Sequence, residues 1–352
     1  MKHSDGLFEK VVAFDNLYFA AKEALAGKRT KTEPAKFYLN LGENLVNLQQ
    51  ALISENYKPG KYTTFYIYEP KKRLISAAPF VDRVVHHAIC RIIEPIFEKS
   101  FIYDSYACRK GKGTHAAINR FTKFSRRYKY ALKVDIKKFF PSIDFEILKE
   151  QILKKISDPK LLILINQIIN NSNTQEPVFE YFPGDQLFTP YERKKGLPIG
   201  NLTSQFFANI YLDRFDHYVK DDLGVKAYIR YVDDMVFFNE NKTYLRHLQN
   251  EVETYLTRYR VKLHPNKCNI FQTAKGIPFL GFLIYPEYRL LMGEGVIRCK
   301  RRLKKLQKQY SEGKVDLDKV RSSVHSWIGH AKHGDTYGLR KSIFGNISFQ
   351  RA

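Results

Sequence analysis

Hydrophobic positions along the chain repeat with two different periods. A period of about 3.6 residues predicts helices at residues 7–26 and about 34–54, each with one apolar face. The period then changes to two, which predicts strands at 62–68 and 73–77 joined by a turn. Helical spacing returns over 80–98. We therefore expect a helical extension, then a β-hairpin, then a long helix.

The remaining chain interleaves short apolar strands with helices. Strands are expected at 130–136 and in two hairpins, the first at 227–238 and the second between 277–285 and 288–292. Helices are expected at 145–155, 202–219, about 243–259 and from 296 onward. Strands interleaved with helices indicate an α+β domain with helical additions.

The charge of the chain indicates which class of partner it binds. The 352 residues include 59 Lys and Arg against 36 Asp and Glu, for a formal net charge of +23. Such an excess favours a polyanionic partner, with nucleic acid first and an anionic membrane surface second. No membrane span is expected, because the most apolar run, Leu161–Ile169, is far shorter than the about 18 residues required.

The four cysteines lie far apart in the sequence and form no CxxC pair: Cys90, Cys108, Cys268 and Cys299. Neither a zinc knuckle nor a disulfide framework fits this spacing. A reducing compartment is therefore expected.

Candidate chemistry begins with three aspartates at the edges of apolar strands. Asp135 ends the segment YALKVD, and Asp233 and Asp234 lie within AYIRYVDDMVFF. Neighbouring carboxylates repel one another, and a divalent cation offsets that cost. Three carboxylates from two strands could hold two Mg²⁺ ions about 3.5–4 Å apart, the arrangement used for nucleotidyl transfer. The alternative is that these aspartates belong to ordinary turns and helix caps.

Two loops suggest contacts with phosphates. Lys194–Leu212 is a glycine-containing loop that leads into a helix, where small residues allow close approach. Ser105–Ile118 combines glycines with Arg109, Lys110 and Lys112. Taken singly, each could equally be an ordinary surface loop.

The order of these motifs resembles that of reverse transcriptases from about residue 60 to 300. The matching segments, in order, are KKRLISAAPFVDRVVHHA, SYACRKGKGTHAA, LKVDIKKFFPSID, GLPIGNLTSQFFANIYL, YVDD, LHPNKCNIF and GIPFLGFLIY. The resemblance implies a right-hand polymerase fold of class α+β. Its expected parts are a helical extension (1–60), fingers (61–130), a palm (131–295, with an insertion at about 150–195) and a helical thumb (296–352).

The resemblance also implies roles at the reacting centre. Asp135, Asp233 and Asp234 would be ligands of two Mg²⁺ ions, or of Mn²⁺, with the carbonyl of Ile136 as a further ligand beside the nucleotide. Lys267 would be the general acid for the leaving pyrophosphate, or else a solvated surface lysine.

Further residues would contact the incoming nucleotide. Lys71 and Arg73 would reach its triphosphate, for which the Arg fork is well suited. Phe140 matches an aromatic steric gate that excludes a 2′-hydroxyl, so the product would be DNA; otherwise it is a core aromatic. Gly200 and Gln205 lie in the nucleotide-facing motif.

Template and primer contacts are implied for eight residues: Arg109, Lys110, Lys112, Gly281, Arg298, Arg301, Arg302 and Lys305. The segment 296–310 holds seven Lys and Arg and no acid, with Leu303, Leu306 and Tyr310 on one helical face. We expect a thumb helix whose basic face grips the duplex by shape and phosphate contacts; the alternative is a solvated amphipathic helix.

Four aromatic and histidine side chains follow close together: His325, Trp327, His330 and His333. Packing or stacking on nucleic acid is favoured over a metal site for this group.

One position departs from the common pattern LPQG, because Ile199 stands where most reverse transcriptases have Gln. The sequence GNLTSQ, with Ser204 and Gln205, resembles the enzymes of diversity-generating retroelements. An aliphatic side chain cannot hydrogen-bond to a base pair, so we expect errors, concentrated at template adenines; a neutral replacement is the alternative.

The resemblance further implies partners and a setting. The partners would be a template RNA and its cDNA, deoxynucleoside triphosphates (dNTPs) and a small basic oligomeric accessory protein, without a membrane. The setting would be the cytoplasm, with a bacterial or phage origin. The alternatives are a retron or group II intron-type reverse transcriptase, and a noncatalytic RNA-binding protein on a polymerase scaffold.

Overall fold

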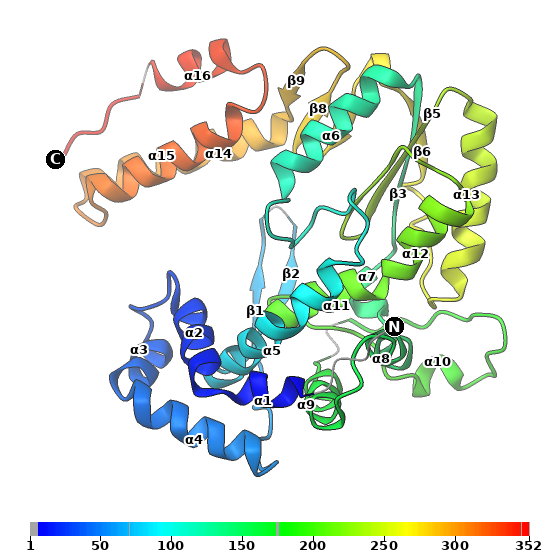
Figure 1. The fold of residues 1–352 in the computed structure, drawn as a ribbon. Coiled ribbons are helices and arrows are strands. Elements are labelled where there is room, and N and C mark those ends of the chain that lie inside the picture. The colour runs from blue at the N-terminus through cyan, green and yellow to red at the C-terminus, as the bar shows by residue number, and fades with distance from the viewer. Residues whose placement is uncertain (1–5, 70, 174–175, 346, 352) are drawn as a thin grey trace.

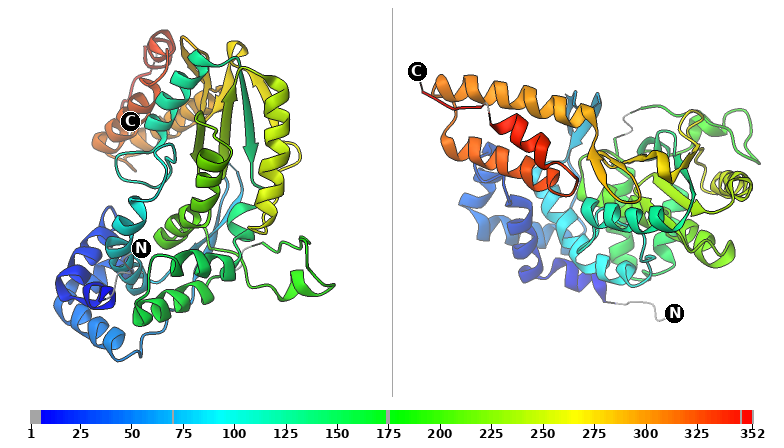
Figure 2. Two further views of the ribbon diagram at one scale, coloured as in Figure 1. Left: turned by 45° about the vertical axis from the view of Figure 1, so that its right-hand side comes forward. Right: turned by 90° about the horizontal axis from the view of Figure 1, so that it is seen from above.

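A computed structural model describes residues 6–69, 71–173, 176–345 and 347–351. In these ranges the strands form three antiparallel sheets with the orders β1-β2, β4-β5-β3-β6 and β7-β8-β9. Helices pack on the four-stranded sheet, and the N-terminal and C-terminal helices lie at opposite ends of one side of the molecule (Figures 1 and 2). None of the helices in this part of the chain is long and apolar enough to cross a bilayer.

The N-terminal helices are shorter than the hydrophobic pattern predicts. The helix expected at 7–26 is divided into α1 (Leu7–Val12) and α2 (Phe14–Leu25), because Ala13 adopts an extended ψ of 134°. The side-chain amide of Asn16 donates to the Val11 carbonyl at this break, at 2.9 Å. The apolar face continues across the break, so periodicity alone does not reveal it.

The second expected helix, at about 34–54, is divided in the same way. It forms α3 (Thr32–Leu39) and α4 (Leu41–Ile53), with the break at Asn40. The β-hairpin and long helix are confirmed as β1 (Thr63–Ile67), β2 (Arg73–Ala77) and α5 (Phe80–Glu98). Pro70, in the expected turn, lies outside the described residues.

The four-stranded sheet is built from β3 (Tyr130–Asp135), β4 (Tyr228–Tyr231), β5 (Asp234–Asn239) and β6 (Asn269–Gln272). Side chains alternate between its two faces. Leu132 and Phe237 join the larger hydrophobic cluster, into which α13 (Lys242–Thr257) packs. Ala131 and Phe238 join a second cluster with α6 (Thr114–Arg127). The sheet therefore packs against other parts of the protein on both faces.

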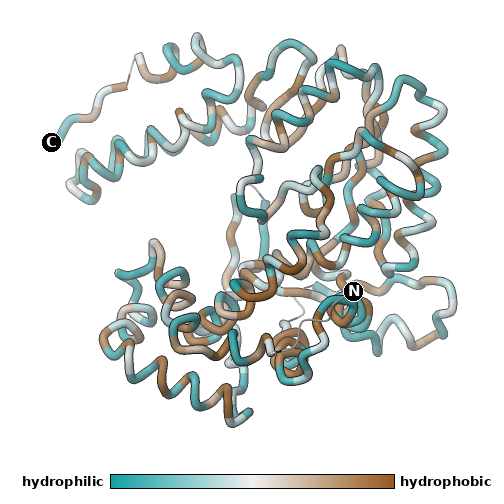
Figure 3. The backbone as a smooth tube through the Cα atoms, in the orientation of Figure 1, coloured by the Kyte–Doolittle hydropathy of each residue, from teal (hydrophilic) through white to brown (hydrophobic). Residues whose placement is uncertain are grey.

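Helical segments connect β3 to β4 along the chain. They are α7 (Phe139–Ser142), α8 (Phe145–Leu153), α9 (Pro159–Asn170), α10 (Thr189–Glu192), α11 (Leu202–Tyr211), α12 (Asp213–His217) and the π-helical turn η1 (Tyr218–Asp222). The continuous helix expected at 202–219 is interrupted at Leu212, where ψ is 4°. Hydrophobic residues are frequent along the central α5, α9 and α11 (Figure 3).

The expected hairpin between 277–285 and 288–292 is corrected by the structure. The first segment folds back on itself at Leu280 and Gly281, whose φ angles are 47° and 88°. Three strands result: β7 (Ile277–Phe279), β8 (Phe282–Ile284) and β9 (Arg289–Leu291), after the 3₁₀ turn η2 (Thr273–Lys275). Two consecutive positive φ values form the tight turn that suits antiparallel strands.

The C-terminal region is helical, as expected from 296 onward. It comprises α14 (Gly293–Ser311), α15 (Leu317–Ala331) and α16 (Tyr337–Phe344), which share a small hydrophobic cluster. Leu303 and Leu306 are buried and Tyr310 is half-buried, which confirms the predicted apolar face of α14.

Candidate active site

The three candidate aspartates meet at one end of the four-stranded sheet. Asp135, the last residue of β3, pairs directly with Asp234, the first residue of β5. Asp234 also pairs with Tyr231 of β4, so Val232 and Asp233 form a two-residue turn between these strands. The antiparallel register therefore brings together acids that lie about a hundred positions apart in the sequence.

The acids lie close enough together to raise the pKa values of Asp233 and Asp234. Burial raises the pKa of Asp233 to about 6, and the charges of Asp234 and Asp135 contribute to the same rise. Burial also raises the pKa of Asp234, while the Lys133 ammonium lowers it in part. Lys133 Nζ lies 3.5 Å from Asp234 Oδ1. Negative charge is thus concentrated at this end of the sheet more than nearby cations balance it.

Lys267 lies beside these acids, as the sequence predicts. Its Nζ is 2.7 Å from Asp135 Oδ2. The loop that carries it is attached to the end of β3, because the backbone N–H of His264 donates to the Asp135 carbonyl at 2.7 Å. Lys267 therefore lies next to the candidate metal-binding acids.

The donor set matches a hard divalent cation. Carboxylate oxygens are the ligands that Mg²⁺ prefers, and mutual repulsion of the carboxylates would fall on binding. Within the described ranges, no three His, Cys, Asp or Glu side chains surround a common metal position. Asp135 and Asp234 contact Lys267 and Lys133 instead. The carbonyl of the buried Ile136 stays a predicted further ligand.

The turn that carries Asp233 is strained. Val232 adopts a φ of 58°, a region that β-branched residues rarely enter. Such a conformation costs on the order of 1–3 kcal/mol and persists only where its surroundings hold it. Arg230, a buried side chain that the sequence analysis did not single out, donates to the Val232 carbonyl at 3.2 Å. A charged residue within an apolar strand was the signal that could have identified it.

The β1-β2 hairpin is attached to the loop that carries Ile199. The Ser76 N–H donates to the Ile199 carbonyl at 3.0 Å. A Cβ at Gly200, where φ is 121°, would lie 2.9 Å from Ile75 Cγ2, so this contact requires glycine. Lys71 and Arg73 are exposed on the same hairpin. The candidate triphosphate residues and the Ile199 loop are therefore parts of one local structure.

Phe140 lies against that same loop. Its carbonyl accepts from the Leu197 N–H at 2.9 Å. The ring is half-buried and meets Phe139 edge-on, with ring centroids 5.8 Å apart. Phe140 thus contacts the core and keeps an accessible side, and its role as a steric gate stays a prediction.

The basic loop 105–118 differs from the expectation for Arg109. The Arg109 side chain is only 5% exposed and forms an ion pair with Glu98 at 2.6 Å. It also donates to the carbonyls of Ile102 and Ser105, each at 2.7 Å. Its guanidinium holds the loop together, so the predicted contact with template phosphates is not supported for this residue.

The other members of the loop are more accessible. Lys110 is exposed, while Lys112 is half-buried with its Nζ 3.4 Å from the centre of the Tyr103 ring. Cys108 Sγ lies 3.3 Å from Oε1 of the exposed Gln205 on α11. The loop and the nucleotide-facing motif are therefore neighbours.

The candidate duplex-binding residues of α14 reach solvent to different extents. Arg301, Arg302 and Lys305 are exposed, and Arg298 is half-buried with Glu294 at 3.8 Å. Gly281 is exposed in the turn between β7 and β8. Their contacts with a duplex stay predictions.

The expected histidine group is only partly assembled. The rings of His333 and His115, from α6, stack with centroids 3.5 Å apart. His330 Nδ1 lies 3.3 Å from His115 Nε2. Trp327 packs on Phe344 instead, and His325 is exposed. The packing role that the sequence favoured agrees with this arrangement, although His115 was not anticipated.

Residues 58–284, more than half of the chain, match the family model described as reverse transcriptase (RNA-dependent DNA polymerase). YkfC of Escherichia coli is 25% identical over 189 residues, which cover 51% of this chain and 46% of that protein. The group II intron-encoded protein LtrA of Lactococcus lactis is 26% identical over 211 residues, or 59% of this chain and 33% of that protein. The chain thus spans less than half the length of these curated relatives.

Solved structures show the same architecture. Apo telomerase from Candida tropicalis aligns with a TM-score of 0.51 at 13% identity, covering 85% of this chain and 64% of that chain. The same telomerase in complex with a fragment of telomeric RNA also gives 0.51 at 13% identity, covering 88% and 59%. At this identity the likeness establishes the fold alone, and the predicted α+β right-hand polymerase fold is confirmed.

Proposed function

The chain belongs to the reverse transcriptase family, and on this premise we propose that it is an RNA-directed DNA polymerase. The observation that carries the proposal is the direct pairing of Asp135 with Asp234, with Asp233 on the adjoining turn. Nucleotidyl transfer by two metal ions needs acids held close together on a rigid support, and these three are half-buried at the end of a sheet.

In this proposal the three aspartates hold two Mg²⁺ ions, or Mn²⁺. Bound there, the ions would lower the pKa of the primer 3′-hydroxyl and stabilise charge on the leaving pyrophosphate. Lys267, which contacts Asp135 at 2.7 Å, would give a proton to that pyrophosphate. Lys71 and Arg73 bind the triphosphate, and Phe140 excludes a ribose 2′-hydroxyl.

Primer extension tests the proposal. Purified protein, an RNA template with an annealed primer, dNTPs and Mg²⁺ are expected to yield cDNA, and Asp234→Asn is expected to abolish it. Asp222→Asn, an exposed aspartate at the end of η1, is the matched control and should retain full activity. Extension that persists at the same rate in Asp234→Asn would refute the assignment.

We further propose that the enzyme is error-prone and serves sequence diversification, with a template RNA and a small basic accessory protein as partners. Support comes from Ile199, whose carbonyl is fixed by Ser76 while its half-buried side chain offers no hydrogen bond. Ile199→Gln is expected to lower misincorporation opposite template adenine, whereas Ile199→Leu should leave it high. Equal error rates at all four template bases in both variants would count against this role.

A second candidate is a group II intron-type reverse transcriptase. The similarity to LtrA, a group II intron-encoded protein, favours it. Low error rates in the unaltered enzyme, together with no effect of Ile199→Gln, would select this candidate over the diversification role.

A further inference from the structure

Arg230 is a buried cation two positions before the strained Val232. Arg230 and Asp216 are both 0% exposed, and they form a two-pronged ion pair. Arg230 Nε lies 2.8 and 2.9 Å from the two carboxylate oxygens of Asp216, and Nη2 lies 2.6 Å from Oδ2. A buried charge is tolerated only with such pairing, so Asp216 fixes where the guanidinium can sit.

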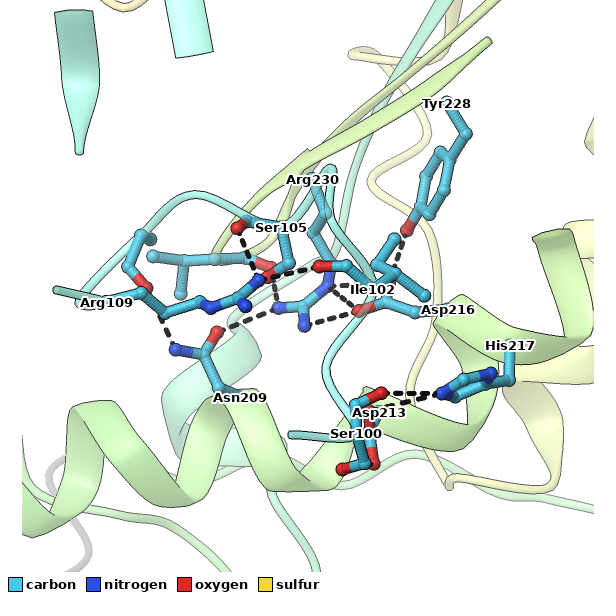
Figure 4. A network of polar contacts seen from close by, with 12 residues as sticks. Ser100, Ile102, Ser105, Arg109, Asn209, Asp213, Asp216, His217, Tyr228 and Arg230 are labelled. Atoms are coloured by element: carbon cyan, nitrogen blue, oxygen red, sulfur yellow. Dashed lines mark hydrogen bonds and ion pairs between the residues drawn. The ribbon is translucent and has the colours of Figure 1, made fainter. Parts of the chain in front are cut away.

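The remaining nitrogen of the guanidinium connects separate parts of the site. Arg230 Nη1 donates to the Asn209 side-chain oxygen at 3.1 Å and to the Val232 carbonyl at 3.2 Å. Asn209 in turn donates to the Ala107 carbonyl at 2.9 Å. Figure 4 shows Arg230 between Asn209 of α11 and Asp216 of α12. One side chain thus joins the Asp233 turn to two helices and, through Asn209, to the loop 105–118.

The backbone of Arg230 is held as firmly as its side chain. Its N–H donates to the Asp104 carbonyl and its own carbonyl accepts from the Tyr106 N–H, both at 3.0 Å. On the other side, Arg230 pairs with Met235 of β5. The backbone of Arg230 is therefore bonded on both sides. Its guanidinium extends from this position and restrains the turn at Val232.

We propose that Arg230 is a positioning residue that holds the Val232 carbonyl, and with it the left-handed turn that presents Asp233 and Asp234. This inference rests on the proposed polymerase activity. Lysine cannot replace Arg230, because a single ammonium lacks the planar fork that binds Asp216 while also reaching two further oxygens.

Hydrogen exchange tests whether Arg230 holds the turn, and the measurement does not require polymerase activity. Replacing both partners, Asp216→Leu with Arg230→Met, avoids leaving one buried charge unpaired. We expect amide exchange across residues 228–239 to become at least tenfold faster, with α4 and α13 unchanged. Unchanged exchange at 228–239, or an equal increase throughout the protein, would overturn the proposal.

A matched pair on the same helix provides the control. Asp213 of α12 contacts Lys155 at 3.2 Å, and no described contact joins either residue to Val232. Replacing that pair, Asp213→Leu with Lys155→Met, should leave exchange at 228–239 near the level of the unaltered protein. An equal effect from the two pairs would also overturn the proposal.

Kinetics test the catalytic half through the strain at Val232. The Asp216/Arg230 replacement is expected to lower kcat at least tenfold while KM for dNTP changes less than twofold. Glycine adopts positive φ without strain. The loss of kcat caused by the Asp216/Arg230 replacement should therefore be at least threefold smaller when Val232→Gly is also present. Equal losses with and without Val232→Gly would show that Arg230 serves only the general fold, which overturns the proposal.

The two failures are distinguishable. If the unaltered protein makes no cDNA, the proposed function fails, and the exchange result alone decides whether Arg230 positions the turn.

Discussion

Asp135 and Asp234 are direct cross-strand partners, at the end of β3 and the beginning of β5. Lys267 contacts the first of them at 2.7 Å, and Lys133 lies 3.5 Å from the second. Lysines thus contact the carboxylates of both strands at this end of the sheet.

Lys267→Met is expected to slow the chemical step. General acid catalysis typically contributes about 10²–10⁴-fold, so kcat should fall by roughly 10²-fold with KM for dNTP nearly unchanged. Steady-state primer extension measures kcat and KM, and single-turnover extension isolates the chemical step. Lys275→Met, at an exposed lysine of the 3₁₀ turn η2, is the control. An unaltered rate in Lys267→Met would leave this residue as a surface lysine.

Phe140→Ala is expected to admit ribonucleotides. Removing the ring frees the space in which a 2′-hydroxyl would clash, so discrimination between dNTPs and ribonucleoside triphosphates should fall at least tenfold, or about 1.4 kcal/mol. The ratio of kcat/KM for the two substrates checks this. Phe140→Tyr keeps the ring and should keep the discrimination. If discrimination survives in Phe140→Ala, the ring is only part of the core.

Gly200→Ala is expected to destabilise the loop beside β2. A Cβ there would lie 2.9 Å from Ile75 Cγ2 and 3.3 Å from the Ser76 carbonyl oxygen, at a φ of 121°. We expect a loss of about 1–3 kcal/mol of unfolding free energy and a raised KM for dNTP. Thermal unfolding and steady-state kinetics measure these effects.

Gly42→Ala is the matched control for that substitution. Gly42 lies within α4, and no atom comes within 4 Å of an added Cβ. Because alanine favours helices over glycine, stability should rise by about 0.5–1 kcal/mol. A loss in Gly42→Ala equal to that in Gly200→Ala would contradict the role given to the loop contact.

Acid is expected to loosen the contact between α6 and the C-terminal helices. Burial lowers the pKa of His115 and of His330, and the charge of His333 lowers both further. A histidine with a lowered folded pKa binds fewer protons when folded than when unfolded. Its stabilising contribution is therefore complete above its ordinary pKa of about 6.5 and decreases as pH falls below it.

Unfolding free energies measured between about pH 7 and pH 5 check this prediction. His115→Asn should lessen the decrease relative to the unaltered protein, because one imidazole with a lowered pKa has been removed. Arg289, which donates to the His333 carbonyl at 3.3 Å, keeps its charge throughout this range. The exposed His325, changed to Asn, should leave the pH profile as it was. If the unaltered protein, His115→Asn and His325→Asn gave identical pH profiles, the contact of His115 with His330 and His333 would not be the cause of the acid sensitivity.

Much of the local structure follows from the sequence. The spacing of hydrophobic residues predicts the bounds of α5, β3 and the hairpin β4–β5 to within about two residues. It does so because the burial of one or both faces of an element determines where its apolar side chains occur. Motif order predicts the three aspartates and Lys267 as one group. Breaks such as Ala13 and Leu212 escape prediction, since the apolar face continues across them.

Tertiary structure decided which charged side chains are available. Arg109 and Lys110 look alike as residues of a basic loop, yet Glu98 binds the first and leaves the second exposed. In the sequence, Arg230 is only a charged residue within an apolar strand. The folded structure shows that it contacts Asp216 and the Val232 carbonyl. Periodicity reports which face of an element is buried, because burial acts locally. Pairing of distant charges depends on register and packing, and it therefore appears only when the chain is folded.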